Sequence, residues 1–244
     1  MKDVKQKVYD SVYGRKEISY EPPHGVIGLL YKKLLRFEVT RHQVSYNLLP
    51  SDGERLLDVG CGNGYFMFMS KDKFKECYGV DVSSLRIERA KERSKKRRSG
   101  NNLHFHKCDV DEGLPFANSF FDAVSCIAVL EHVFNPPNVV DEIRRVLKPG
   151  GIFIVQVPNI AWIPYRFNLL FGKLPTTGGV YLGVDWEHLH NFTKSTLCQL
   201  LTHKGFEIQT VSCSGVFANI RRLWSSVLAS DVVAKAHKTE RSSL

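Results

Sequence analysis

The segment Leu56-Leu57-Asp58-Val59-Gly60-Cys61-Gly62-Asn63-Gly64 sets the architecture of this chain. Its apolar first part indicates a buried strand, and its glycines follow where that strand ends. Glycine adopts positive φ angles and lets the backbone approach a ligand closely, and a helix that follows would present free amide groups there. A dinucleotide-binding loop has the spacing G-x-G-x-x-G, but this chain has Tyr65 at the last position. Asp58 would oppose a pyrophosphate, whereas it suits a cationic ligand.

On the carboxyl side of this loop, strands and helices alternate. The hydrophobic pattern predicts strands over 55–59, 77–80, 103–108, 121–126, 152–157 and 206–212, and helices over 83–97, 139–147 and 193–204. Such alternation is typical of a parallel sheet with right-handed crossovers and helices on both faces. We therefore predict an α/β fold with a Rossmann-like, doubly wound, mostly parallel sheet.

Three regions follow from the pattern along the chain. Residues 1–50 are predicted as an N-terminal helical extension, in which apolar residues recur at helical spacing from about Val26 to Leu49. Residues 51–213 form the central domain, which contains an insert rich in aromatic and turn residues at 158–187. Residues 214–244 predict a C-terminal helix followed by a disordered basic tail over the last ten residues, Lys235 to Leu244.

The composition excludes several classes of protein. The chain has 34 Lys and Arg against 25 Asp and Glu, which gives a net charge of +9. We expect no transmembrane helix, since no window of about 18 uninterrupted apolar residues exists. We also expect no secretory signal, since no apolar stretch follows the charged start. The six Cys form no C-x-x-C pair, which argues against a zinc site or a disulfide framework and favours reduced thiols in the cytoplasm.

Two further acids stand at the ends of predicted strands. Asp81 closes the second strand and Asp109 ends the third. In an open parallel sheet, ligands bind outside the carboxyl ends of the strands, where an acid can accept ribose hydroxyls. Asp109 could accept the exocyclic amine of an adenine, while the Val110 amide meets a ring nitrogen. Each acid alone could instead cap a turn or helix, but together with Asp58 they describe a pocket for a cationic adenosine.

This combination resembles the class I S-adenosylmethionine-dependent methyltransferases over residues 50–212. The matching segments are Leu56–Gly64, Gly79–Asp81, Cys108–Val110, Leu114–Phe116, Ser119–Val124, Leu130–Val133 and Leu147–Gly151. The element Leu130-Glu131-His132-Val133 is similar to the L-E-H-V element of the small-molecule branch. That branch includes quinone O-methyltransferases and enzymes of polysaccharide, lipid and antibiotic pathways.

The resemblance implies a sheet of the seven-stranded type, but we find no clear seventh strand, because residues 216–234 read better as helix. The resemblance also implies S-adenosylmethionine as the cofactor. By this resemblance, the glycine-rich loop holds the methionine portion, Asp81 the ribose, and Asp109 with Val110 the adenine, while the backbone near Ile127 passes the sulfonium. The expected cofactor-binding residues are Asp58, Gly60, Cys61, Gly62, Gly64, Asp81, Val82, Asp109, Val110 and Ile127.

Two histidines are candidates for catalysis. His132 could act as the general base that takes the proton of a substrate hydroxyl, or it could brace the loop after the fourth strand. His190 is the second candidate, and it shares a face with His188 if the segment is extended. Relatives with the pattern E-x-x-E-H can hold a divalent metal. Here the first acid is replaced by Ala128, so a hard oxygen ligand is missing and we predict no metal.

The resemblance implies an enzyme that transfers methyl from S-adenosylmethionine to a hydroxyl of a small, lipid-like or glycan-type acceptor and releases S-adenosylhomocysteine. Two alternatives stay open: an RNA methyltransferase that uses the basic residues between 86 and 98, and a non-catalytic binding subunit of methyltransferase fold. The complete set of carboxylates argues against the subunit. No aromatic residues interleave with the basic run, so a base-stacking platform is not indicated and we do not expect a nucleic-acid partner.

The aromatic insert and the C-terminal stretch bear on the acceptor. An aromatic, acid-poor lid suits a hydrophobic or amphiphilic acceptor and would exclude water, and the alternative is ordinary packing over the sheet. Residues 216–234 contain Arg221, Arg222 and Trp224 among apolar residues, a pattern that also fits a helix in a membrane interface. The sequence therefore leaves peripheral membrane contact open, and it leaves the oligomeric state open as well.

Overall fold

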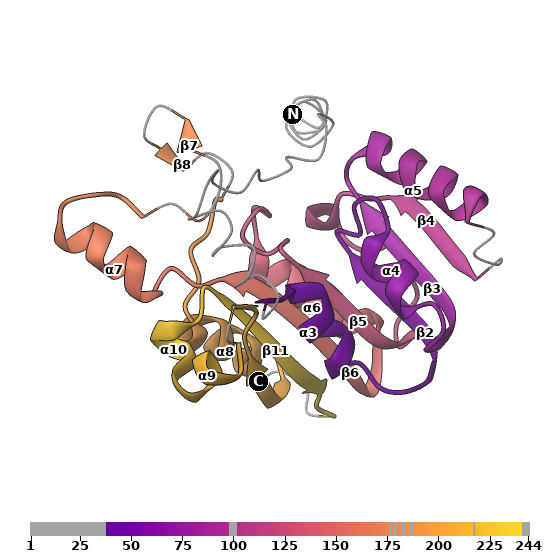
Figure 1. The fold of residues 1–244 in the computed structure, drawn as a ribbon. Helices are drawn as coiled ribbons and strands as arrows, with labels where there is room; N and C mark the ends of the chain where they lie inside the picture. The colour runs from indigo at the N-terminus through magenta and orange to yellow at the C-terminus, as the bar shows by residue number, and fades with distance from the viewer. Residues whose placement is uncertain are drawn as a thin grey trace.

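The structure, a computed structural model, describes residues 38–97, 102–175, 177, 180–181, 184–185, 188–216 and 218–240. Its centre is a seven-stranded sheet with the strand order β4-β3-β2-β5-β6-β11-β9, drawn in Figure 1. The strands are β2 (Gly53–Val59), β3 (Phe74–Asp81), β4 (Leu103–Lys107), β5 (Phe121–Ile127), β6 (Leu147–Pro158), β9 (Phe206–Ser212) and β11 (Asp231–Lys238). Within the described ranges, no helix is both long and apolar enough to cross a bilayer.

The order of the strands fixes where a ligand can bind. β2 to β6 pair in parallel, whereas β11 is antiparallel to both of its neighbours. The chain runs from β2 outward to β3 and β4, and it then returns to β5 on the other side of β2. The strand order therefore reverses between β2 and β5, and open α/β sheets bind ligands at the carboxyl ends of the strands at such a point. The predicted mostly parallel, doubly wound sheet is confirmed.

Two sets of helices cover the two faces of this sheet. The helices are α3 (Arg41–Leu48), α4 (Tyr65–Ser70), α5 (Ser84–Lys96), α6 (Pro136–Val146) and α8 (Lys194–His203). Helices α3, α4 and α5 pack in the apolar cluster that contains Leu56, whereas α6 and α8 pack in the cluster that contains Leu57. Neighbouring residues of a strand point to opposite faces, so the continuous apolar run of β2 is buried on both sides.

The end of the chain differs from the prediction. Residues 235–238 were expected in a disordered tail, but they belong to β11, which inserts between β6 and β9. Among the described residues 216 and 218–230, helix formation is limited to α9 (Ala218–Arg221), the 3₁₀ turn η2 (Arg222–Trp224) and α10 (Ser225–Leu228). Four residues of β11 are fully buried, Val232, Val233, Ala234 and Ala236. The strand forms because two existing strands supply its partners, which a local pattern does not reveal.

The predicted extension and insert are described in part. In the extension, β1 (Glu38–Val39) pairs with β10 (Gly215–Val216), and α3 follows; residues 1–37 lie outside the described residues. In the insert, α7 (Ile163–Leu170) precedes the short pair β7 (Val180–Tyr181) and β8 (Val184–Asp185). No residue of α7 is buried, and this helix stands out from the sheet in Figure 1.

Candidate active site

A cavity of about 930 Å³ lies at the carboxyl ends of β2, β3 and β5. Small-molecule sites occupy about 300–1,000 Å³, so this space is large enough for a nucleoside-sized ligand and part of an acceptor. Most of the residues predicted to bind the cofactor line it, namely Gly60, Cys61, Gly62, Asp81, Val82, Asp109, Val110 and Ile127. His132 lines it as well.

The glycine-rich loop is shaped by its backbone. Gly60, Gly62 and Gly64 have φ angles of 72°, 52° and 78°, a region that L side chains rarely adopt. The amides of Gly60 and Cys61 both donate to the carbonyl of Val80, at 2.8 and 2.9 Å, which ties the loop to the end of β3. A Cβ at Gly60 would lie 2.2 Å from Cγ2 of Val129. The glycines therefore let this loop pass close to the loop after β5.

Asp81 connects that loop to the next helix. Its Oδ2 accepts the amide of Gly62 at 2.9 Å, and its Oδ1 accepts the amide of Ser83 at 2.9 Å. The side chain is buried at the end of β3 and lines the cavity. These two bonds hold the carboxylate in one orientation, so it is a preorganised acceptor for ligand hydroxyl groups.

The sequence left two roles open for Asp109, a cap of a turn or helix and a ligand-binding acid, and its position in the structure fits both. Its carboxylate accepts the amide of Asp111 at 3.2 Å and caps the 3₁₀ turn η1 (Val110–Glu112). It also lines the cavity, next to the buried Val110. Capping therefore fixes the place of this acid without removing it from the ligand space.

Two of the predicted cofactor residues, Asp58 and Gly64, are not among the residues that line the cavity. Asp58 is buried beneath the loop, where its Oδ1 accepts a hydrogen bond from the Ser125 hydroxyl at 2.7 Å. Burial raises its pKa to about 7, the Ser125 hydrogen bond works against this, and nearby Asp81 adds to it. Gly64 begins α4, where a Cβ would lie 2.8 Å from Cε1 of Phe105. Both residues therefore support the conformation of the glycine-rich loop without lining the cavity.

The raised pKa of Asp58 predicts a stability that depends on pH. An unfolded Asp loses its proton near pH 4, whereas Asp58 keeps it in the folded chain up to about pH 7. Folding is therefore penalised increasingly as the pH rises from about 4 to about 7, by at most about 1.4 kcal/mol per pH unit. Asp58→Asn should remove this penalty, so its gain in unfolding free energy over wild type should grow with pH and level off above about pH 7.

Urea unfolding of both proteins between about pH 4 and pH 8 measures this difference. The comparison with wild type is needed because His42 acts in the opposite sense: burial and then the charge of Arg41 lower its pKa to about 4. Asp72→Asn, at a side chain that is 83% exposed, is the matched control. A difference between Asp58→Asn and wild type that is constant over this range would contradict the assignment.

The loop after β5 lies opposite the glycine-rich loop. Ala128 has a φ of 56°, which is uncommon for a residue with a Cβ and costs about 1–3 kcal/mol. Its amide donates to the carbonyl of Gln156 at 3.1 Å. Ile127 and Ala128 both line the cavity, so this strained turn lies where the resemblance expects the sulfonium.

Glu131, His132 and His188 form a cluster at one side of the cavity. The Nε2 of His132 lies 4.0 Å from Oε1 of Glu131, and the rings of His132 and His188 meet edge to face at 4.7 Å between centroids. Glu131 is 1% exposed, and neither of its oxygens has a hydrogen-bond partner among the described residues. Burial raises the pKa of Glu131 to about 8. At neutral pH this carboxyl is therefore largely protonated and can donate a hydrogen bond.

His190 does not take the place that we predicted. Its Nε2 lies 3.3 Å from the carbonyl of Phe134, and it is not among the residues that line the cavity. The physical reason is a bend: the amides of Leu189 and His190 both donate to the carbonyl of Glu131, at 2.8 and 3.1 Å. The segment is therefore not extended, and His188 alone of the two lines the cavity.

The same cluster is where a metal could bind. Glu131, His132 and His188 each offer a ligand atom, and these atoms lie within 4.8 Å of one another. Imidazole and carboxylate are accepted by divalent ions such as Zn²⁺. Residue 128 is Ala, so the further oxygen that the metal-binding pattern contains is missing. The absence of a metal stays a prediction, which this cluster makes testable.

Several cavity residues come from segments that no motif marked. They are Thr40, Arg41 and His42 at α3, Arg86 and Arg93 on α5, Tyr165 on α7, and Ser230 and Asp231 at the start of β11. Arg86 and Arg93 belong to the basic run and are seven residues apart, which puts them on one face of a helix. That spacing was the signal available in the sequence. The others depend on how distant elements pack.

A family model described as a methyltransferase domain matches residues 50–203. The chain belongs to this methyltransferase domain family. The predicted class I family, with S-adenosylmethionine as its donor, is thereby confirmed, whereas the L-E-H-V branch stays a prediction.

Among curated relatives, a probable S-adenosylmethionine-dependent methyltransferase of Mycolicibacterium smegmatis is 27% identical over 176 residues, which is 69% of this chain and 59% of the relative. A ubiquinone biosynthesis O-methyltransferase of Dechloromonas aromatica is 35% identical over 118 residues, 48% of this chain and 50% of the relative. The domain thus covers less than two thirds of the length of either relative.

Among solved structures, the [4+2]-cyclase SpnF superimposes with a TM-score of 0.61 and 20% identity, covering 98% of this chain and 97% of that chain. This similarity confirms the fold. Since that protein is named a cyclase, the fold by itself does not fix the reaction, and the function of this methyltransferase domain rests on its site.

Proposed function

We propose that this protein transfers a methyl group from S-adenosylmethionine to a hydroxyl of a small or lipid-like acceptor. The observation that carries the proposal is Asp81, a buried carboxylate held by two amides inside a ligand-sized cavity at the reversal of strand order. The glycine-rich loop and Asp109 border the same space.

The residues fit the donor chemically. Asp81 would accept the ribose hydroxyls, and Asp109 with the Val110 amide would meet the adenine. The loop Gly60–Asn63 would pass the methionine portion, because its glycines leave no Cβ between backbone and ligand. The carboxylates of Asp81 and Asp109 border the cavity, where they would accept hydrogen bonds from the ribose hydroxyls and the adenine amine of the donor.

The chain's own groups supply positioning and proton handling. S-adenosylmethionine, when bound, supplies an electrophilic methyl group on a sulfonium. Holding the acceptor oxygen in line with that methyl is worth about 7–11 kcal/mol in well-oriented reactions. His132 would accept the hydroxyl proton, and a protonated Glu131 would donate to the acceptor and hold it beside His132. The turn at Ala128 closes the other side of the reacting position.

Two features support a hydrophobic acceptor. Tyr165 of α7 lines the cavity, so the aromatic insert contributes to the wall. The relative from Dechloromonas aromatica is named for ubiquinone biosynthesis, which supports transfer to oxygen on a lipid-like molecule.

The test is an acceptor screen with the purified full chain and donor labelled in its methyl group. We expect label in an organic extract of lipid and quinone fractions, and none in glycan or RNA fractions. The RNA fraction is the necessary comparison because basic side chains are exposed on α5 and at the residue that caps it, namely Arg89, Lys91, Lys95, Lys96 and Arg97. Label in RNA alone, with steep salt dependence, would replace the proposed acceptor. No label anywhere, despite donor binding, would refute methyl transfer to these classes.

A further inference from the structure

We propose that α7, the residues after it and η2 form a docking surface for an anionic lipid bilayer. The exposed residues of α7 and its continuation are large and apolar. Phe167, Leu169, Leu170, Phe171 and Leu174 are each between 56% and 74% exposed. A monomeric protein rarely leaves a contiguous apolar patch of this kind unless the patch binds a partner or a membrane.

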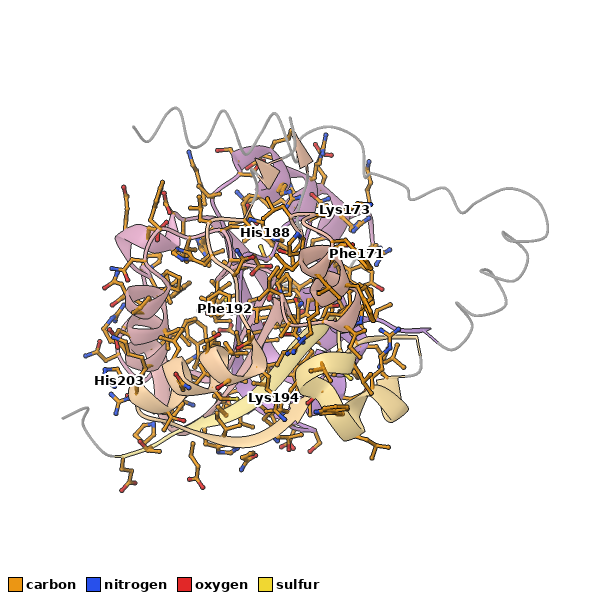
Figure 2. The ribbon with its side chains drawn as sticks, turned by 90° about the vertical axis from the view of Figure 1, so that its left-hand side faces the viewer. Phe171, Lys173, His188, Phe192, Lys194 and His203 are labelled. Atoms are coloured by element: carbon orange, nitrogen blue, oxygen red, sulfur yellow. The ribbon has the colours of Figure 1, made fainter. Side chains whose placement is uncertain are left out.

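η2 adds to the same side of the molecule. Leu223 is 86% exposed and Trp224 is 63% exposed. Figure 1 shows α7 on the same side as α9 and α10, which flank η2. Figure 2 faces this side and shows Phe171 and Lys173 near each other.

Direct contacts hold the two segments together. The guanidinium of Arg221 lies 6.0 Å from the ring centroid of Trp162, the residue before α7. The Nδ2 of Asn159 donates to the carbonyls of Ser226 and Ala229, at 3.3 and 2.8 Å. The start of the insert is therefore anchored to α10. The exposed apolar residues of both segments lie on the same side of the molecule, and we call these residues the apolar face.

The charged residues near the apolar face are basic, which favours an anionic bilayer as the partner. The sequence has no Asp or Glu between Glu142 and Asp185, and none between Glu207 and Asp231. Arg166 and Lys173 flank the exposed residues of α7 and are themselves exposed. Long basic side chains can bury their stems while their charges reach lipid headgroups. Exposed Trp and Leu with basic and no acidic neighbours along the sequence are typical of elements that lie in the interface of an anionic bilayer.

The other basic surface of the molecule lacks this combination. The exposed basic residues of α5 lie toward the opposite edge of the sheet, beside β4 (Figure 1). Among the described residues of that helix, Leu85 is the large apolar side chain that is exposed, at 39%. α5 thus has charge without apolar anchors, whereas the apolar face has both.

The position of the apolar face suggests how a membrane-anchored acceptor could reach the cavity, an inference that rests on the proposed function. Tyr165 belongs to α7 and lines the cavity, as does Thr177 after α7. Docking through the outer residues of α7 would hold the cavity wall next to the bilayer. An acceptor anchored by an apolar tail could then place its polar head in the cavity while the tail stays in lipid.

Sedimentation with vesicles tests the docking surface without donor or acceptor. The full chain should pellet with vesicles of phosphatidylcholine and phosphatidylglycerol, and much less with phosphatidylcholine alone, and high salt should weaken binding. The double variant Leu170→Ser/Phe171→Ser should lower the partition coefficient at least tenfold. Leu85→Ser removes an exposed apolar side chain of α5 and should leave partition unchanged.

The opposite results overturn the proposal. Wild type that stays in the supernatant with anionic vesicles, or a double variant that pellets like wild type, would each refute it. If wild type ignores vesicles and sedimentation equilibrium shows a dimer that the double variant dissociates, a second copy covers the apolar face instead. Calorimetry of donor binding on the same preparations separates the two proposals, because loss of donor binding with vesicle binding intact counts only against the proposed function.

Discussion

Asp81→Ala is expected to weaken S-adenosylmethionine binding by at least about a hundredfold in titration calorimetry. Hydrogen bonds to a charged group contribute about 1.5–3 kcal/mol each, and every 1.4 kcal/mol is a factor of ten in affinity. Two ribose hydroxyls donating to one carboxylate therefore account for about two powers of ten or more. The orientation of that carboxylate is already set by the amides of Gly62 and Ser83, so binding does not have to order it.

The same two amides make a control necessary, because removal of the carboxylate also releases Gly62 and Ser83. Denaturant unfolding of Asp81→Ala shows whether the domain remains folded, and Asp81→Asn keeps the shape of the side chain while removing the charge. Asp72→Ala changes an exposed Asp before β3, at the other end of that strand, and should bind the donor like wild type. Unchanged binding in a folded Asp81→Ala would refute the assigned cavity.

Patterns confined to one strand and the loop after it could be predicted from the sequence. An apolar strand that ends in glycines or in an acid places those residues at the carboxyl edge of a parallel sheet, and the structure brings Gly60, Gly62, Asp81 and Asp109 to one cavity. The strand order does the rest, because it puts β2 next to both β3 and β5. The local sequence and a general rule of sheet topology were therefore sufficient to predict the cofactor side of the cavity.

The acceptor side depends on contacts between distant segments. β11 has two Val, which strands favour, and two Ala, which are depleted in strands. It exists because β6 and β9 supply partners on both of its edges. His188 reaches the cavity and His190 does not, because two amides converge on the carbonyl of Glu131. No spacing within residues 187–193 encodes that bend. The same holds for Tyr165 and Arg41, whose helices are placed by packing rather than by a motif.

His132→Ala is expected to lower the rate of methyl transfer by about 10²–10⁴-fold, the usual contribution of a positioned general base, while donor affinity stays within a few-fold of wild type. This separation is expected because His132 lies in the cluster with Glu131 and His188, whereas the donor's ribose is assigned to Asp81 at the end of β3. The rate of methyl transfer is measured in single turnovers across pH, with labelled donor and the acceptor found in the screen. The donor affinity is measured by calorimetry.

The controls separate a base from a brace or a metal ligand. His190→Ala removes a ring outside the cavity lining and should keep the wild-type rate. If His132 only supports the loop after β5, His132→Ala should lose donor binding or unfolding free energy. If His132 is the general base, the variant should keep donor binding and unfolding free energy but show a changed pH–rate profile. Full activity of His132→Ala eliminates the base. Treatment with EDTA should leave the wild-type rate unchanged, because position 128 offers no carboxylate, and a loss that added Mg²⁺ or Zn²⁺ restores would instead assign His132, His188 and Glu131 to a metal.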